Sequence, residues 1–438
     1  MRYLFLMSSL AIALLVQVVA IQAAEMAVQD NGLARLVATA LADNPELKAS
    51  DARWKMFASR AKQAGSLEDP MLMLKAQNLL ARDPFTFNRD ATTAKVIGIS
   101  QQLPFWGKRA LREEIATLEA ESYRHSIEER KLELARMVKE TWYQLYATDK
   151  SLAIIEKNLK IMDDFLTIAE SKYAVGQGAQ ADIYKAGLEK SKMLDMQISL
   201  KQKRASLAAN LNYLLYRPGS TQVPPIPDFP LPELTQTVDK LNALAQENRP
   251  QVKSLVAQAG KGNAARRLAH KEFWPDVNVS FEYMFRETVQ NGMANDPGYN
   301  MFTLGLTFNL PVQWGRRQAM LAESSSETTM ATDELNSLKN SISYVINDSL
   351  AQLERRKRLV ELYRGGIIPQ AEQSLESALI GYRVNKVDFL TLLDGRVSLF
   401  NYERELYESQ AEYMMALARL EATVGTDLTL SVPQETKK

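Results

Sequence analysis

The sequence has 438 residues, of which 46% are hydrophobic and 24% are charged, and its formal net charge is +1. This composition is typical of a folded protein, and near neutrality removes the general electrostatic case for a nucleic-acid partner. The sequence contains no cysteine, which excludes disulfides and thiolate chemistry, and only two histidines, His125 and His270. We therefore expect no catalytic residues, no metal site and no cofactor.

The N-terminal segment has the layout of a secretory signal peptide, which we place at residues 1–24. Arg2 precedes an apolar run over residues 4–19, and small residues follow up to Ala24. A membrane anchor is the alternative, but Ser8, Ser9 and Gln17 shorten the apolar stretch. No other stretch approaches the ~20 apolar residues that a spanning helix needs. The sequence therefore predicts an exported protein, with the cleavage site left open.

Proline placement predicts unusually long helices. No proline lies between Pro104 and Pro218. The stretch from Arg109 to Tyr173 therefore predicts one helix of about 60 residues, on the order of 90 Å long. Such a length indicates a coiled coil or a helical tube. A turn is expected at residues 175–178, and the next helix should begin with Asp182 as its N-cap and end near residue 216.

An internal repeat organises the chain. Residues 103–109 (LPFWGKR) return as residues 310–317 (LPVQWGRR), and residues 173–176 (YAVG) return as residues 382–385 (YRVN). These matches keep their order and a nearly constant offset, which indicates a duplication. We predict a first repeat over 25–216, a Pro-rich linker over 217–235, a second repeat over 236–425 and a tail over 426–438. Each repeat should run helix, β-hairpin (about 71–103 and 277–310) and long helical hairpin (about 108–216 and 315–424).

Both predicted hairpins show the period-2 alternation of strands with one apolar face. In the second hairpin the apolar positions are Phe281, Tyr283, Phe285, Leu304, Leu306 and Phe308. The alternating positions are Asn278, Ser280, Glu282, Thr303 and Thr307. Two ordinary hairpins covered by helices would explain this pattern, but bulky aromatics and strand lengths near ~9–11 residues favour membrane strands. The first set should then face lipid and the second set a lumen.

Four strands cannot close a barrel, and an open sheet edge in lipid leaves backbone groups unpaired. If the strands enter a membrane, several chains must therefore pool them. Three chains would give twelve strands, an even number within the known range. The same symmetry would gather the long helices into a tube, so a homotrimer is expected.

These features resemble the outer-membrane efflux family of Gram-negative bacteria, the TolC-like channel-tunnel proteins. The resemblance rests on the two Leu-Pro…Trp-Gly-basic junctions, the hairpins before them, the Tyr-x-Val-Gly turn and Gly365-Gly366-Ile367-Ile368-Pro369. It implies a mainly α fold with a small β part, in which a trimer forms a twelve-stranded outer-membrane barrel and a periplasmic α-helical tunnel. It also implies two partners, a periplasmic adaptor (membrane fusion) protein and a proton-driven inner-membrane pump. Asp69-Pro70-Met71 and residues 101–109 look closest to the heavy-metal efflux branch.

The resemblance also implies site residues at the helical tips and near the closed pore. The tip turns that would contact the adaptor are Val175, Gly176 and Gln177 in the first repeat and Val384, Asn385 and Lys386 in the second. Asp394 stands where the family often has an acidic residue that faces the pore, and three copies would form a cation-favouring ring. Asp388 is either a second pore residue or a helix N-cap. Asn385 replaces a glycine, but Asn tolerates the left-handed conformation.

Two tryptophans are expected at the membrane boundary. Trp106 and Trp314 occupy the two junction motifs, and an amphipathic indole suits a membrane interface. The alternative for each is a core tryptophan in the joint between helix and strand. Two other functions stay open, a periplasmic coiled-coil adaptor or scaffold and the exit duct of a type I protein-secretion system. An adaptor normally has one helical hairpin, whereas this sequence predicts two.

Overall fold

The computed structural model describes residues 32–291 and 294–428. The predicted signal peptide and most of the predicted tail lie outside these residues. The described chain is mainly helical, with one four-stranded sheet, as the predicted fold class requires. It divides into two compact units, of which unit 1 takes residues 32–49, 127–250 and 339–428 and unit 2 takes residues 50–126 and 251–338. Each unit contains segments of both sequence repeats.

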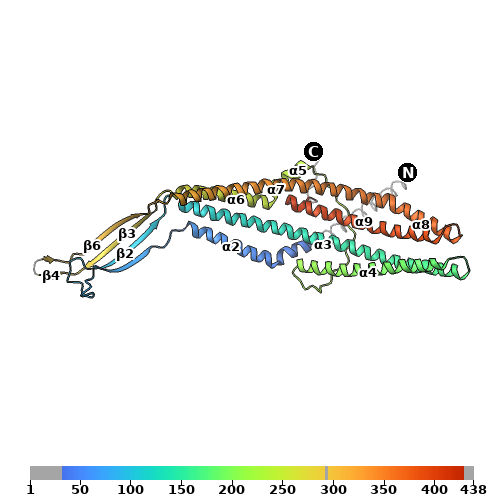
Figure 1. Cartoon of the computed structure of the whole chain (residues 1–438), viewed down its shortest axis with the longest axis horizontal. Coiled ribbons are helices and arrows are strands. Elements are labelled where there is room, and N and C mark those ends of the chain that lie inside the picture. Colours follow the sequence, from blue (N-terminus) through green and yellow to red (C-terminus); the bar gives the residue numbers. More distant parts are fainter. Residues whose placement is uncertain (1–31, 292–293, 429–438) are drawn as a thin grey trace, which may run out of the picture. The chain divides into compact units, whose positions relative to one another are not determined.

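Unit 2 contains an antiparallel sheet with the strand order β1-β2-β3-β6 (Figure 1). Its strands are β1 (Met71–Gln77), β2 (Ala94–Leu103), β3 (Val277–Arg286) and β6 (Met301–Phe308). In the first hairpin Met71 lies opposite Ser100, and in the second Asn278 lies opposite Thr307. Both residues of the second pair follow those of the first by 207 positions, so the two hairpins share one register.

The loop of the second hairpin contains two further short strands. Within residues 287–300, β4 (Val289–Asn291) and β5 (Ala294–Asp296) form an antiparallel pair. Asn291 lies opposite Ala294 at the end of this pair.

Helices make up most of the rest of the described chain. Besides a helix over residues 32–43, they are α2 (Pro45–Gly65), α3 (Lys108–Ala174), α4 (Gln180–Leu214), α5 (Val238–Asn248), α6 (Pro250–Lys271), α7 (Trp314–Leu362), α8 (Ile368–Arg383) and α9 (Phe389–Val424). The 67-residue α3 confirms the helix predicted from the absence of proline. A π-helical turn, Tyr363–Ile367, separates α7 from α8. It contains Gly365 and Gly366 and precedes Pro369, all of which weaken a regular helix.

The predicted N-cap of the second long helix is wrong. Ala179 occupies the cap of α4 without a side-chain hydrogen bond, and Asp182 lies in the first helical turn. An acidic side chain in the first turn still complements the helix dipole, so Asp182 favours the helix without capping it.

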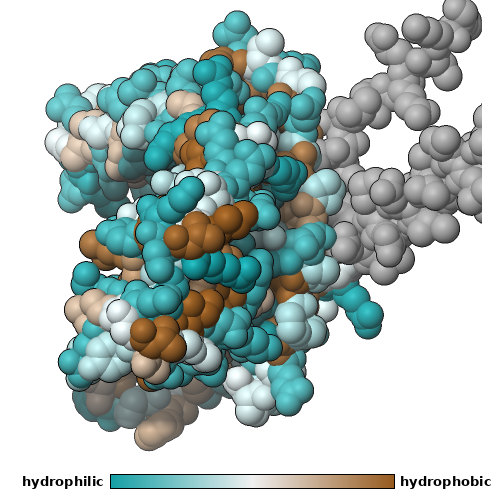
Figure 2. All heavy atoms as spheres, turned by 90° about the vertical axis from the view of Figure 1, so that its right-hand side faces the viewer, coloured by the Kyte–Doolittle hydropathy of each residue, from teal (hydrophilic) through white to brown (hydrophobic). Residues whose placement is uncertain are grey.

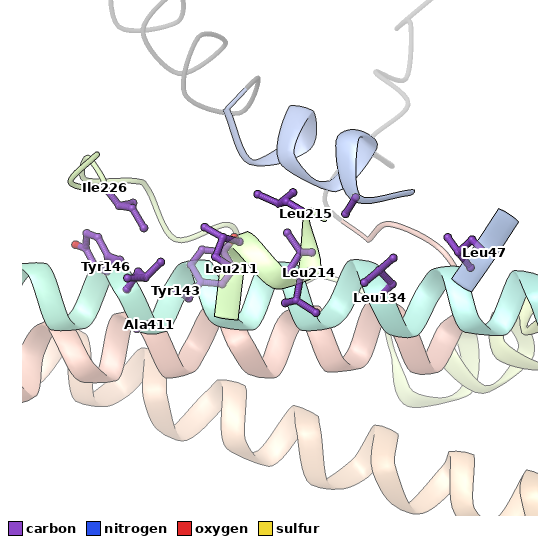
Figure 3. Close-up of a cluster of buried hydrophobic side chains, with 12 residues drawn as sticks. Leu47, Leu134, Tyr143, Tyr146, Leu211, Leu214, Leu215, Ile226 and Ala411 are labelled. Carbon is purple, nitrogen blue, oxygen red and sulfur yellow. The ribbon is translucent and has the colours of Figure 1, made fainter. Parts of the chain in front are cut away.

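The segment between α4 and α5 packs onto the helices of unit 1. It contains neither helix nor strand, as its prolines predict. Ile226 from this segment belongs to a buried apolar cluster with Tyr143 and Tyr146 of α3 (Figure 3). The ring of the partly buried Phe229 contacts both tyrosine rings. The Tyr146 hydroxyl lies 2.8 Å from the Asp228 carboxylate, and burial together with this carboxylate raises the pKa of Tyr146. The segment is therefore held in place by apolar packing and by a hydrogen bond to the buried Tyr146.

A buried cation joins the sheet to α3 in unit 2. Lys108, the first residue of α3, is only 1% exposed, and its Nζ lies 2.9 Å from Asp276 and 3.1 Å from Glu272. Asp276 also accepts the N–H of Phe105 at 2.7 Å. Burial alone would raise the pKa of the Asp276 carboxyl, but the Phe105 N–H and the Lys108 ammonium outweigh it and lower this pKa. The start of α3 is thereby tied to the residue that precedes β3.

Two arginines repeat one contact in the two halves of the chain. Arg109 donates to the carbonyl of Gly65, the last residue of α2, at 2.8 and 3.1 Å. Arg317 donates to the carbonyl of Glu272, just after α6, at 2.6 Å. Each arginine thus caps the end of the helix that precedes its own hairpin, where carbonyl groups lack helical partners. These equivalent contacts extend the repeat from sequence to side-chain geometry.

We expect Lys108→Met to destabilise the protein by about 3–5 kcal/mol, because it leaves Asp276 and Glu272 partly buried without their cation. The measurement is chemical unfolding of the detergent-solubilised protein, followed by circular dichroism. Lys55→Met is the matched control, since Lys55 forms an exposed ion pair with Asp51, and exposed pairs contribute about 0–1 kcal/mol. Equal midpoints for the two variants would contradict this role of Lys108.

Candidate functional site

The four-stranded sheet has one continuous apolar face. Directly opposed residues of antiparallel strands share a face. The register therefore aligns one row across the sheet, Leu72, Ile99, Phe281 and Leu304, and a second row, Leu74, Ile97, Tyr283 and Phe302. Phe285, Leu306 and Phe308 belong to the same face. The side chains on β6 are strongly exposed in the single chain, with Phe302 at 72% and Leu304 at 67%. An apolar surface of this kind requires a cover of lipid or protein.

The opposite face carries the five residues predicted to line a lumen, namely Asn278, Ser280, Glu282, Thr303 and Thr307. An ion pair crosses this face, with Lys75 Nζ on β1 only 2.9 Å from the Glu282 carboxylate on β3. Gly98 on the intervening β2 leaves room for it, because a Cβ there would lie 3.1 Å from Glu282 Cγ. The structure thus separates the two predicted sets of side chains onto opposite faces.

The two helical tips of unit 1 share one turn geometry. The N–H of Gly176 donates to Tyr173 and that of Asn385 donates to Tyr382, while Gln177 and Lys386 each donate to the carbonyl five residues earlier. Gly176 and Asn385 have φ values of 73° and 60°, so asparagine does adopt the left-handed conformation of its glycine counterpart. Val175 and Val384 are exposed at these turns. Apolar side chains lie among polar ones at this end of unit 1 (Figure 2).

Lys172 connects the two tips. From the end of α3, its ammonium group donates to the carbonyl of Tyr382 at 2.5 Å and to the side chain of Asn385. The same ammonium lies 4.3 Å from the centre of the Tyr382 ring, within the range of a cation–π contact. Tyr382 itself is buried in a cluster shared by α3, α4, α8 and α9. One side chain of the first hairpin therefore holds the turn of the second.

The two candidate pore residues have different environments. Asp388 is the N-cap of α9 and accepts the N–H of Thr391 at 3.0 Å. Hydrogen bonds from the Thr391 hydroxyl and N–H lower the pKa of this carboxyl. The N-cap interpretation of Asp388 thus fits its geometry. Asp394 is exposed on α9, next to the buried Leu392 and Leu393, and is available to a neighbouring molecule or to solvent.

Trp106 and Trp314 are both exposed in the chain, at 88% and 64%. Within the described single chain, neither indole is buried in a core. The ring of Trp314 contacts Phe273 with centroids 5.7 Å apart, and the carbonyl of Trp106 accepts from Lys271. Both indoles thus lie beside the sheet–helix junctions with most of their surface free.

Three lysines, Lys75, Lys108 and Lys172, have contacts that were not predicted from the sequence. Lys108 and Lys172 act on partners more than 150 positions away, so no local pattern reveals them. Lys75 had a detectable signal, because the offset of 207 maps it onto Glu282, and two opposite charges at equivalent positions suggest a pair. No group of His, Asp and Glu suited to a metal ion occurs in the described part of the chain. Within those same residues, none of the helices combines the length and apolarity needed to cross a membrane.

Comparison with solved structures shows the fold of outer-membrane channels. The chain matches the outer membrane protein VceC from Vibrio cholerae with a TM-score of 0.75 at 18% identity, over 91% of this chain and 97% of that one. It matches CusC, described as forming a transmembrane channel, with a TM-score of 0.76 at 15% identity, over 90% of this chain and 92% of that one.

Sequence comparison then gives the family. The cobalt-zinc-cadmium resistance protein CzcC of Cupriavidus metallidurans is 23% identical over 320 residues, covering 71% of this chain and 72% of that protein. The outer membrane efflux protein family matches residues 36–215 and 241–426, and the chain belongs to this family. The resemblance inferred from the junction and tip motifs is thus confirmed. The protein is an outer-membrane efflux channel.

The two faces of the sheet should tolerate charge differently. Leu306→Arg places a cation on the apolar face and should cost about 2–4 kcal/mol if the residue lies near the bilayer midplane. Thr307→Arg, one position along the strand and on the opposite face, should cost much less. Heat-modifiability on gels and outer-membrane yield measure both effects. Equal tolerance at the two positions would contradict the assignment of the faces.

The Lys172 contact should hold the second tip in place. Lys172→Met removes charge-assisted hydrogen bonds of about 1.5–3 kcal/mol, so amide exchange at residues 382–387 should accelerate roughly tenfold or more. Lys386→Met, a change of the same type in the exposed turn, is the control. Unchanged exchange in Lys172→Met would show that the tip does not depend on this side chain.

Proposed function

We propose that three copies of this chain form the exit duct of a tripartite efflux system. In this assembly the sheets pool twelve strands into an outer-membrane barrel, and the long helices form a periplasmic tunnel. The observation that carries the proposal is the exposed apolar face of the sheet in a chain of the outer membrane efflux family. Lipid would cover that face, and the opposite face would line the lumen. The duct would act passively, without cofactor and without enzymatic activity.

The partners follow from the same assembly. A periplasmic adaptor protein would contact the tip turns, where exposed Val175 and Val384 offer apolar anchors. A proton-driven inner-membrane pump would supply the cargo. The division into repeats at 25–216 and 236–425 belongs to this proposal and is supported by the shared hairpin register and tip geometry. Trp106 and Trp314 would lie at the boundary between the barrel and the periplasm.

Metal ions are the proposed cargo class. The support is the similarity to CzcC, which is named for cobalt, zinc and cadmium resistance. Deleting the gene should lower the host's tolerance to divalent metals and raise metal retained by the cells, with restoration by the wild-type gene. A type I secretion duct would instead leave metal tolerance unchanged and abolish the export of a protein. If neither metal tolerance nor protein export changed, metal ions would be excluded as the cargo, and other small molecules would be the remaining cargo class.

A ring of Asp394 carboxylates is the proposed pore constriction. Asp394→Asn should weaken block by multivalent cations by about tenfold, which corresponds to ~1.4 kcal/mol, and should leave assembly intact. Asp388→Asn is the internal control, because asparagine caps a helix nearly as well as aspartate and conductance should hardly change. Planar-bilayer recordings measure both variants. If only Asp388→Asn alters cation block, the constriction ring is formed by Asp388, and the assignment to Asp394 is wrong.

A further inference from the structure

The edges of the sheet are where a second copy of this chain would attach. Within the described residues, β1 pairs along one side only, with β2, and β6 pairs along one side only, with β3. A bilayer core offers no water to the remaining N–H and C=O groups, so both edges need a strand. The trimer alone does not specify the register in which β6 of one copy pairs with β1 of the next.

The internal repeat supplies that register. Adding 207 to both members of a β1–β2 pair gives a β3–β6 pair, as Gln77 opposite Ala94 becomes Met284 opposite Met301. The sheet is therefore two equivalent hairpins, joined once, between β2 and β3. In that junction Gly98 lies opposite Glu282 and Ser100 lies opposite Ser280.

We propose that β6 of one copy pairs with β1 of the neighbouring copy in the register of the β2–β3 junction. This inference rests on the proposed trimer and specifies its barrel interface. The same offset places Gly305 opposite Lys75 of the neighbouring copy and Thr307 opposite Met73 of that copy. The ladder then runs with Thr303–Phe308 antiparallel to Leu72–Gln77.

The two faces of the sheet agree with this register. It pairs Leu306 with Leu74 and Phe308 with Leu72, so the apolar face continues from one copy to the next. It also pairs Thr303 with Gln77 on the polar face. A shift by one residue would set residues of the apolar face opposite residues of the other face, for example Leu304 opposite Lys75 or Gln77, so only even shifts compete with the proposed register.

The charged pair on the polar face is compatible with the same register. Lys75 and Glu282 are repeat equivalents, and their ion pair crosses β2 where Gly98 has no side chain. The equivalent of Gly98 is Gly305 on β6, which is also a glycine. Glu282 can therefore reach across Gly305 to Lys75 of the neighbouring copy in the same way. Around a closed barrel, lysines and glutamates would alternate in one neutral ring facing the lumen.

Cysteine cross-linking tests the register directly, because the chain has no cysteine of its own. The double variant Thr307→Cys with Met73→Cys should form interchain disulfides under mild oxidation and give a covalent trimer on denaturing gels. Within one chain the two positions lie on opposite edges of the sheet, which are about 14 Å apart at ~4.8 Å per strand, and Thr307 lies four residues along β6 from the residue in line with Met73, so a disulfide cannot join them. Each single variant should stay monomeric on the same gel.

Two shifted double variants are the matched controls. Thr307→Cys combined with Met71→Cys, or with Lys75→Cys, keeps the face and moves the register by two residues. Diagonal Cβ atoms lie about 7–8 Å apart, so these variants should yield less than about a tenth of the covalent trimer. Reduced samples of all variants should run as heat-modifiable trimers, which shows that each one assembles.

The outcomes separate the inference from the proposed function. Preferred cross-linking of a shifted pair, or an intact trimer that cross-links at none of the pairs, would overturn the register while the trimer stands. A wild-type protein that is monomeric by native mass spectrometry in detergent would overturn the trimer itself. Cross-linking at Thr307 and Met73 in preference to both shifted pairs is the result that the repeat predicts.

Discussion

A strand inside a bilayer must find a partner for every backbone N–H and C=O group, because the hydrocarbon offers no water to hydrogen-bond with them. The sheet of this protein satisfies that requirement at three strand pairs and leaves β1 and β6 each with one open side in the described chain. Its exposed aromatic and leucine side chains make the sheet equally unsuited to water. The need to pair these edges explains why a chain with only four membrane strands would function as an oligomer.

The duplication provides a way to pair both edge strands with identical chains. One hairpin register, used twice, makes a sheet whose two edges are complementary to each other, so identical chains can add in a ring. The same duplication places Arg109 and Arg317 at equivalent helix ends, where each anchors a long helix beside its hairpin. Lys108 breaks the equivalence, since its buried contacts with Asp276 and Glu272 tie the first long helix to the second hairpin. The two repeats thus form equivalent helices and strands, and charged side chains whose contacts are not repeated join one half to the other.

The sequence predicted those features that depend on local pattern. Alternation gave the strands and their faces, the missing prolines gave the 67-residue α3, and asparagine at position 385 was compatible with a left-handed turn. Features that depend on distant partners stayed hidden, as the Lys172 contact with Tyr382 shows. Asp182 was misjudged as a cap because its residue type suits both the cap and the first turn. The role of Asp394 in the pore stays a prediction, since it depends on neighbouring copies.

Amide hydrogen exchange of the membrane-embedded protein tests the central claim most directly, because it reports whether the edge strands are paired. If neighbouring copies close the barrel, the amides of β1, over Met71–Gln77, should be protected as strongly as those of β2, and far more strongly than those of the connecting residues 79–92. Detergent conditions that dissociate the assembly should remove protection from β1 and β6 before β2 and β3. Rapid exchange throughout β1 in the intact membrane, with β2 still protected, would show an open edge and would contradict the account.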